Sequence, residues 1–190
     1  MSTLFTGKPV SSVSEASHFQ ILLDSLYAMY SRSPKDQREL EVHAQELSVR
    51  LLKVGRVSDI RWVFSSFRAV KTLWRDYPAL CQHLLACADD ENRTLAKRSK
   101  CRGLLKKLTN WFFVGELAMM KDALRCLQEL SLFLQKESAS VVDALFRVEG
   151  VCTTFKALKE QSGKSVSVFL KQWGINQTFK SVSLSAPSEK

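Results

Sequence analysis

The side chains best suited to metal binding or nucleophilic chemistry gather in one short segment of this sequence. Cys81, His83 and Cys87 offer three potential ligands within seven residues. A structural zinc site needs four ligands, usually supplied as two pairs, and the sequence shows no second pair. We therefore expect these thiols to fill a helix interface, and we expect no metal and no other cofactor.

Other candidates for catalysis are weaker. His18 and His43 have no Ser or Cys partner at a suggestive spacing, and Asp89 and Asp90 resemble a solvated acidic turn. Hard cations need more oxygen ligands than that pair supplies. The chain has no Gly-rich phosphate loop, no G-x-S-x-G and no H-E-x-x-H. These observations predict a protein that is not an enzyme.

A run of basic residues is the strongest indication of a ligand. Seven cations follow the acidic turn within fifteen residues, with no acid among them: Arg93, Lys97, Arg98, Lys100, Arg102, Lys106 and Lys107. Such a run would bind a phosphate backbone through sequence-independent, salt-dependent attraction. The alternative is a solvated charged face.

A second candidate for nucleic-acid contact is the pair Arg61 and Trp62. A tryptophan beside an arginine near a helix start can stack on a displaced base. The alternative for Trp62 is ordinary core packing.

Length and composition limit the kind of protein that can carry these sites. The chain has 190 residues and a formal net charge of +9, which suits one domain and raises the odds of a polyanionic partner. No apolar run is long enough to cross a membrane, and the first residues lack the pattern of a secretory signal. The odd count of five cysteines is typical of a reducing compartment.

Helical periodicity dominates the chain. We expect helices over about 14–30, from Pro34 to about Lys53 with Ser33 as the cap, and from Ser58 to an interruption at Tyr77-Pro78. A short continuation to 88 follows, then a loop or exposed helix over 89–103. Further helices are expected over 109–136, 140–158 and 166–173.

The expected fold is all-α, a multi-helix bundle of about six helices around the 109–136 helix. Residues 1–13 are predicted to be a flexible N-terminus, 14–175 the helical domain, and 176–190 a polar, frayed tail. The predicted core comprises Leu23, Leu26, Phe64, Phe67, Leu73, Leu117, Leu124, Leu127, Leu145 and Phe155.

Several segments together resemble a known family. Residues 59–71 (DIRWVFSSFRAVK), with Trp74 and the YPAL of 77–80, resemble the "RW" region of hAT-superfamily transposase domains. Residues 26–35 match the stretch before that region, and 117–124 and 130–135 a stretch after it. The likeness is strongest to the domesticated vertebrate group related to zinc finger protein 862, and it covers about residues 18–160.

The resemblance implies part of a larger domain. In hAT transposases a large helical insertion interrupts a ribonuclease-H-like core that carries an Asp, Asp, Glu triad. No residue here matches a triad position, so the resemblance implies a chain without catalysis. Arg61 and Trp62 match the family's arginine and tryptophan, and the latter lies near DNA in active relatives.

Two hypotheses of function follow. The first is a non-catalytic, domesticated, nuclear module that contacts nucleic acid through the basic residues and Trp62. The second is a helical protein-interaction module, for example in SUMO-linked or chromatin assemblies, without direct DNA binding. An exposed apolar patch of several hundred Å² would favour the second. The oligomeric state stays open.

Overall fold

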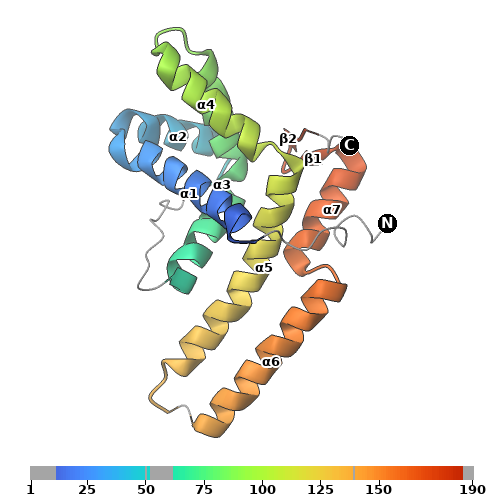
Figure 1. Cartoon of the computed structure of the whole chain (residues 1–190). Helices are drawn as coiled ribbons and strands as arrows, with labels where there is room; N and C mark the ends of the chain where they lie inside the picture. Colours follow the sequence, from blue (N-terminus) through green and yellow to red (C-terminus); the bar gives the residue numbers. More distant parts are fainter. Residues whose placement is uncertain (1–11, 50, 52–61, 139, 186–190) are drawn as a thin grey trace.

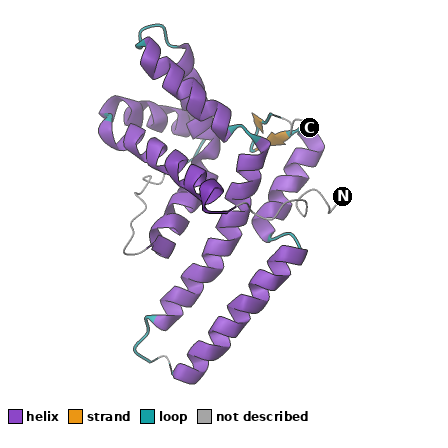
Figure 2. Cartoon of the chain, viewed as in Figure 1, coloured by secondary structure: helices purple, strands orange, loops and turns teal. Residues whose placement is uncertain are grey.

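The computed structural model describes residues 12–49, 51, 62–138 and 140–185, with side chains from Phe19 onward except that of Trp62. Within these ranges the chain forms seven helices and one two-stranded hairpin (Figures 1 and 2). The prediction of an all-α, multi-helix fold is confirmed. None of the helices in these ranges is both long and apolar enough to span a bilayer.

The first two helices form an antiparallel pair joined at a capped junction. Helix α1 spans Ser12–Arg32 and α2 spans Pro34–Glu46. The Ser33 Oγ accepts a hydrogen bond from the Asp36 amide at 3.2 Å, and Pro34 occupies the first turn, as predicted. The junction therefore fixes the position of Asp36 in the first turn of α2.

Helix α2 ends earlier than the predicted Lys53. Ser48 adopts a left-handed φ of 54°, its amide donates to Gln45, and the Val49 amide donates to the Ala44 carbonyl at 2.8 Å. This is a Schellman motif with serine in the position that usually holds glycine, and Val49 packs against the core. The prediction was wrong because the termination signal lies in backbone hydrogen bonds rather than in a glycine.

Helix α3 spans Trp62–Asp89 and crosses the middle of the molecule, packing against α2, α4 and α5. The predicted interruption at Tyr77-Pro78 is wrong, because the helix continues through Pro78. Proline removes the donor for the carbonyl four residues earlier, that of Trp74. Lys180 donates to this carbonyl, so the freed acceptor keeps a partner. The predicted helix start at Ser58 lies outside the described residues.

All of the basic run except Arg93 lies in helix α4, Leu95–Leu108, which Thr94 caps. Helix α5, Trp111–Leu134, follows with Asn110 as its cap, whose Oδ1 accepts from the Phe112 and Phe113 amides at 2.9 and 3.3 Å. The first half of α5 lies between α3 and α7 and is largely buried. Its second half continues beyond them.

Helix α6, Val141–Glu160, pairs with the second half of α5, and the two extend away from the other helices (Figure 1). No residue of α6 is buried. The predicted core position Leu145 is therefore wrong, because α6 packs mainly on α5 and Leu145 is 61% exposed. Of the other predicted core residues, Phe64, Phe67, Leu127 and Phe155 are half-buried and the rest are buried.

The predicted polar tail is wrong for the residues that follow α7, Lys164–Asn176. Strands β1, Thr178–Phe179, and β2, Val182–Ser183, form a hairpin whose two turn residues have φ of 49° and 68°. Phe179 is fully buried against Trp74, with ring centroids 4.7 Å apart. The Ser185 amide then donates to Thr109 at 2.9 Å. Residues 1–11 and 186–190 lie outside the described ranges.

Candidate functional site

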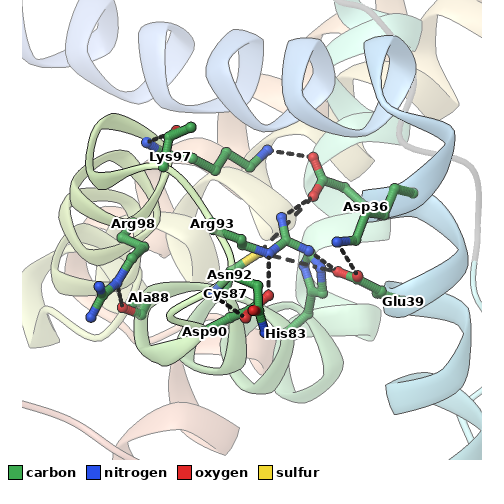
Figure 3. A network of polar contacts seen from close by, with 12 residues as sticks. Asp36, Glu39, His83, Cys87, Ala88, Asp90, Asn92, Arg93, Lys97 and Arg98 are labelled. Carbon is green, nitrogen blue, oxygen red and sulfur yellow. Dashed lines mark hydrogen bonds and ion pairs between the residues drawn. The ribbon is translucent and has the colours of Figure 1, made fainter.

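Arg93, predicted to meet phosphates, lies instead among three carboxylates of this chain (Figure 3). Its Nη1 is 2.8 Å from the Asp36 Oδ1, its Nε is 3.1 Å from the Asp90 Oδ2, and its Nη2 pairs with Glu39. Its side chain is 8% exposed. The expectation that Arg93 is free to bind a phosphate therefore needs correction.

Three further cations of the run, Lys97, Arg98 and Arg102, also have internal partners. Lys97 pairs with the second oxygen of Asp36. The Nε of Arg98 and the Nη2 of Arg102 donate to the Ala88 carbonyl at 3.2 and 3.3 Å, in the last turn of α3. Cations at a helix C-terminus complement its unpaired carbonyls and its dipole. These residues thus hold α4 against α2 and α3.

The remaining members of the run, Lys100, Lys106 and Lys107, are exposed on α4. Lys100 and Lys107 are seven residues apart and so share one helix face. Arg61 lies outside the described residues. Trp62 begins α3, but its side chain is not among those described, so its stacking role stays a prediction.

Two of the three carboxylates that hold Arg93 belong to a cluster that joins α2 to α3, here called the α2–α3 quartet: Asp36, Glu39, His83 and Cys87. One ligand-type atom of each lies within 4.8 Å of the others. The His83 Nε2 is 3.2 Å from the Glu39 Oε2 and 3.6 Å from the Cys87 Sγ, which is 4.0 Å from the Asp36 Oδ1. Sequence reasoning singled out His83 and Cys87 and missed the two carboxylates.

Burial sets the protonation of the quartet. It lowers the pKa of His83 against the opposing effect of Glu39, so the imidazole is neutral, and it raises the pKa of the Cys87 thiol to about 12. Burial also tends to raise the pKa of Asp36, but hydrogen bonds from Lys97 and Arg93 outweigh it and lower that pKa below its usual value. Asp36 is therefore ionised, while His83 is a neutral imidazole and Cys87 a neutral thiol.

The His83 ring is oriented from its other side. Its Nδ1 is 3.0 Å from the Tyr30 Oη, a buried contact between α3 and α1. A hydroxyl both donates and accepts, so Tyr30 satisfies either neutral tautomer of His83. The ring therefore keeps its position whichever nitrogen carries the proton.

The geometry argues against nucleophilic catalysis by Cys87. A cysteine nucleophile needs thiolate character and access to substrate. Cys87 is 2% exposed, and its raised pKa keeps the sulfur protonated. Cys87 and Glu39 also both face the Nε2 of His83, so the carboxylate does not support the imidazole from its opposite nitrogen as in a triad.

A second polar contact, between α5 and α7, is also enclosed. The Lys121 Nζ donates to the Ser165 Oγ at 2.9 Å and lies 4.7 Å from the Trp74 ring centroid. Ser165 is 3% exposed, and its amide donates to the Asp122 Oδ2 at 2.8 Å. A buried serine that cannot meet a substrate serves the packing of α7 rather than a reaction.

Several exposed apolar side chains lie at the free end of the α5–α6 pair. They are between 40% and 77% exposed, and we call them the apolar end: Leu132, Leu134, Val141, Val142, Leu145, Phe146 and Val148. Single exposed apolar residues are ordinary on a protein surface, whereas large apolar patches are typical of interaction sites.

No protein-family model and no solved structure matches the chain. The resemblance to hAT transposase domains therefore stays a prediction from the residues that carry it.

Proposed function

We propose that this chain is a helical protein-interaction module that binds through the uncovered face of α6. The observation that supports this is the exposure of the apolar end, where Val141 is 77% and Phe146 is 69% exposed. Exposing such side chains in water costs about 25 cal/mol for each Å² that a partner could cover. A partner that covers them gains that free energy.

The pattern of α6 indicates what kind of partner fits. Ala144, Val151, Phe155 and Leu158 are half-buried toward α5, and a second stripe, Val141, Leu145, Val148 and Cys152, lies on the exposed part of the helix. The spacing of this second stripe is four, three and four residues, which is the pattern of a helix-packing seam. The partner is therefore a helix with an apolar seam.

The spacing of the second stripe, four, three and four residues, is the same in both directions along the helix. The stripes of two copies that run antiparallel can therefore pack against each other. In that register Val141 faces Cys152 of the other copy, and Leu145 faces Val148. A second copy of this chain is accordingly the partner we propose. Four residues on each side cover much less than the ~1,200–2,000 Å² of a stable interface, so we expect a dissociation constant above about 1 µM.

Sedimentation over a range of concentrations tests this proposal. The wild type should show a reversible monomer–dimer equilibrium, and Leu145→Lys should shift it to monomer by at least tenfold. Ile175→Lys is the matched control, because Ile175 is also exposed, at 69%, but lies on α7. A wild type that stays monomeric at the highest soluble concentration, or equal effects of both substitutions, would contradict the proposal.

Nucleic-acid binding is the second candidate, supported by the exposure of Lys100, Lys106 and Lys107 on a helix that has no acid. Fewer cations are available to phosphates than the sequence indicates, because Arg93 and Lys97 are paired with carboxylates of this chain. Both this role and a location in the nucleus stay proposals that rest on charge and on the hAT resemblance.

Salt-dependent binding to duplex DNA separates this candidate from a general effect of charge. Reversal of Lys100, Lys106 and Lys107 to Glu should weaken binding on every sequence and reduce the salt slope by up to about three. The control is the reversal of three exposed lysines on other helices, Lys156, Lys159 and Lys171. Equal losses in the two variants would exclude a site on α4.

A further inference from the structure

We propose that the α2–α3 quartet binds a thiophilic divalent transition metal, zinc above all, through the Asp36 Oδ1, the Glu39 Oε2, the His83 Nε2 and the Cys87 Sγ. The donor set contains one imidazole nitrogen, one sulfur and two carboxylate oxygens, all ligands that zinc takes. Cysteine and histidine together favour zinc over magnesium or calcium. This inference is independent of the α6 surface.

The ligands come as two pairs on facing helices. Asp36 and Glu39 are three residues apart on α2, and His83 and Cys87 are four residues apart on α3. Both spacings place the two side chains on one helix face, and α2 packs directly on α3. The second pair that a zinc site requires is thus present, as carboxylates rather than as cysteines or histidines.

The distances between donor atoms already approach those of a tetrahedral site. Zinc bonds of about 2.0–2.3 Å imply edges of roughly 3.3–3.6 Å between neighbouring ligand atoms. The observed separations are 3.2 Å from Glu39 to His83, 3.6 Å from His83 to Cys87 and 4.0 Å from Cys87 to Asp36. The other three of the six edges are no longer than 4.8 Å, so side-chain rotations must shorten them for the metal to bind.

The main competitor for the metal is the guanidinium of Arg93, which contacts the same two oxygens, the Asp36 Oδ1 and the Glu39 Oε2. Metal binding must move its two terminal nitrogens. Its Nε contact with Asp90 and the Lys97 contact with the other Asp36 oxygen involve different atoms and can persist. With Cys87 as a thiolate, the metal and three anionic ligands carry about −1, which the nearby Lys97 and Arg93 offset.

Binding must also release one proton, because Cys87 is protonated in the metal-free protein. The thiol proton leaves to solvent as the metal–sulfur bond forms, so the affinity rises about tenfold for each pH unit near neutrality. Glu39, whose side chain is 35% exposed, gives the otherwise buried site an opening to solvent. Tyr30 then accepts from the Nδ1–H of His83 and leaves Nε2 free for the metal.

Titration of the EDTA-treated chain with Co²⁺ tests the site, because a cobalt–thiolate bond gives a charge-transfer band in the near ultraviolet. The wild type should bind one Co²⁺, and Zn²⁺ should displace it. Cys87→Ser should lose the band while circular dichroism verifies its fold, and Cys152→Ser, at an exposed cysteine, should keep it. Arg93→Gln should bind at least tenfold more tightly, since it removes the competitor.

Two results would overturn the proposal. The first is the absence of a band in the wild type. A band seen in Arg93→Gln alone has the same meaning, because the guanidinium then excludes the metal from the native protein. The second is a band that survives Cys87→Ser; its loss in Cys101→Ser would then assign the thiolate to Cys101, a fully buried neighbour of Cys87.

Discussion

Lys180 donates a hydrogen bond to the main-chain carbonyl of Trp74, which lies 106 residues earlier in the chain. Pro78 deprives this carbonyl of its usual helical donor. The same ammonium group is 3.3 Å from the Arg75 carbonyl and 5.7 Å from the Trp74 ring centroid. Burial lowers the pKa of Lys180 to about 8, so the amine is still protonated at pH 7. A residue of the terminal hairpin therefore completes the central helix.

This relationship predicts a coupling between Lys180 and Pro78. Lys180→Met keeps the aliphatic stem but leaves the Trp74 carbonyl unpaired, so the free energy of unfolding should fall by about 1–2 kcal/mol. In a Pro78→Ala background the new amide can donate to that carbonyl, and the loss should be clearly smaller. Denaturant unfolding of the four proteins in the cycle measures the coupling.

Lys171→Met is the control for this cycle, because Lys171 is exposed on α7. It should leave the free energy of unfolding unchanged within about 0.5 kcal/mol. Equal losses from Lys180→Met in the two backgrounds would show that the lysine does not act through the carbonyl that Pro78 frees.

The start of α7 gives a second prediction, which concerns Gly163. A Cβ at this position would lie 2.3 Å from the Asp122 Oδ2, the oxygen that accepts from the Ser165 amide. Gly163→Ala should displace this interhelical cap and lower the free energy of unfolding by about 1–3 kcal/mol. Thermal unfolding of the purified variant measures the change.

Gly174→Ala is the matched control within the same helix. A Cβ there meets no atom within 4 Å, and alanine favours the helix by about 0.5–1 kcal/mol. It should therefore stabilise the protein. If both substitutions shift the melting temperature in the same direction, Asp122 does not cap α7 in the way described.

Helix positions were largely predictable from the sequence, because their signals are local. Ser33 caps α2 as predicted, and α5 and α6 begin within two residues of their expected starts, behind the caps Asn110 and Ser140. The errors concern features set by distant residues. The continuity of α3 depends on Lys180, and the order of residues 178–185 depends on Phe179 entering a pocket of aromatic rings.

The candidate sites were less predictable for the same reason. No local sequence signal indicates that Asp36 on α2 pairs with Arg93, which lies 57 residues later. From the sequence alone, the basic residues are therefore expected to be available to a phosphate backbone. The spacing of Asp36 and Glu39 and that of His83 and Cys87 are visible in the sequence, but not the fact that the two faces meet. Likewise, the apolar residues of α6 read as core until its neighbours are known.

A third prediction follows from the burial of Asp36, which is 1% exposed and paired with Arg93 and Lys97. In the presence of EDTA, Asp36→Asn should lower the free energy of unfolding at pH 6–7 by about 3 kcal/mol, because it leaves two cations without their shared partner. Asp24→Asn, at an exposed aspartate of α1, should have little effect.

The same pair of variants gives the pH dependence. The pKa of Asp36 is lower in the folded than in the unfolded state, so its contribution is complete above the unfolded value near 3.8 and declines as the pH falls through the folded value. The stability gap that comes from the ion pairs should therefore shrink as the pH falls below about 4. A gap that stays undiminished under strongly acidic conditions would contradict the ion pairs.

The central claim, that α6 binds α6 of a second copy in an antiparallel register, is tested most directly by an engineered crosslink. Val141→Cys should form intermolecular disulfides with Cys152 under mild oxidation, seen as a covalent dimer on a non-reducing gel and as a 141–152 linkage by mass spectrometry. Ile175→Cys, at an equally exposed site on α7, should not. No dimer above the level of that control, or a 141–141 linkage in place of 141–152, would contradict the account.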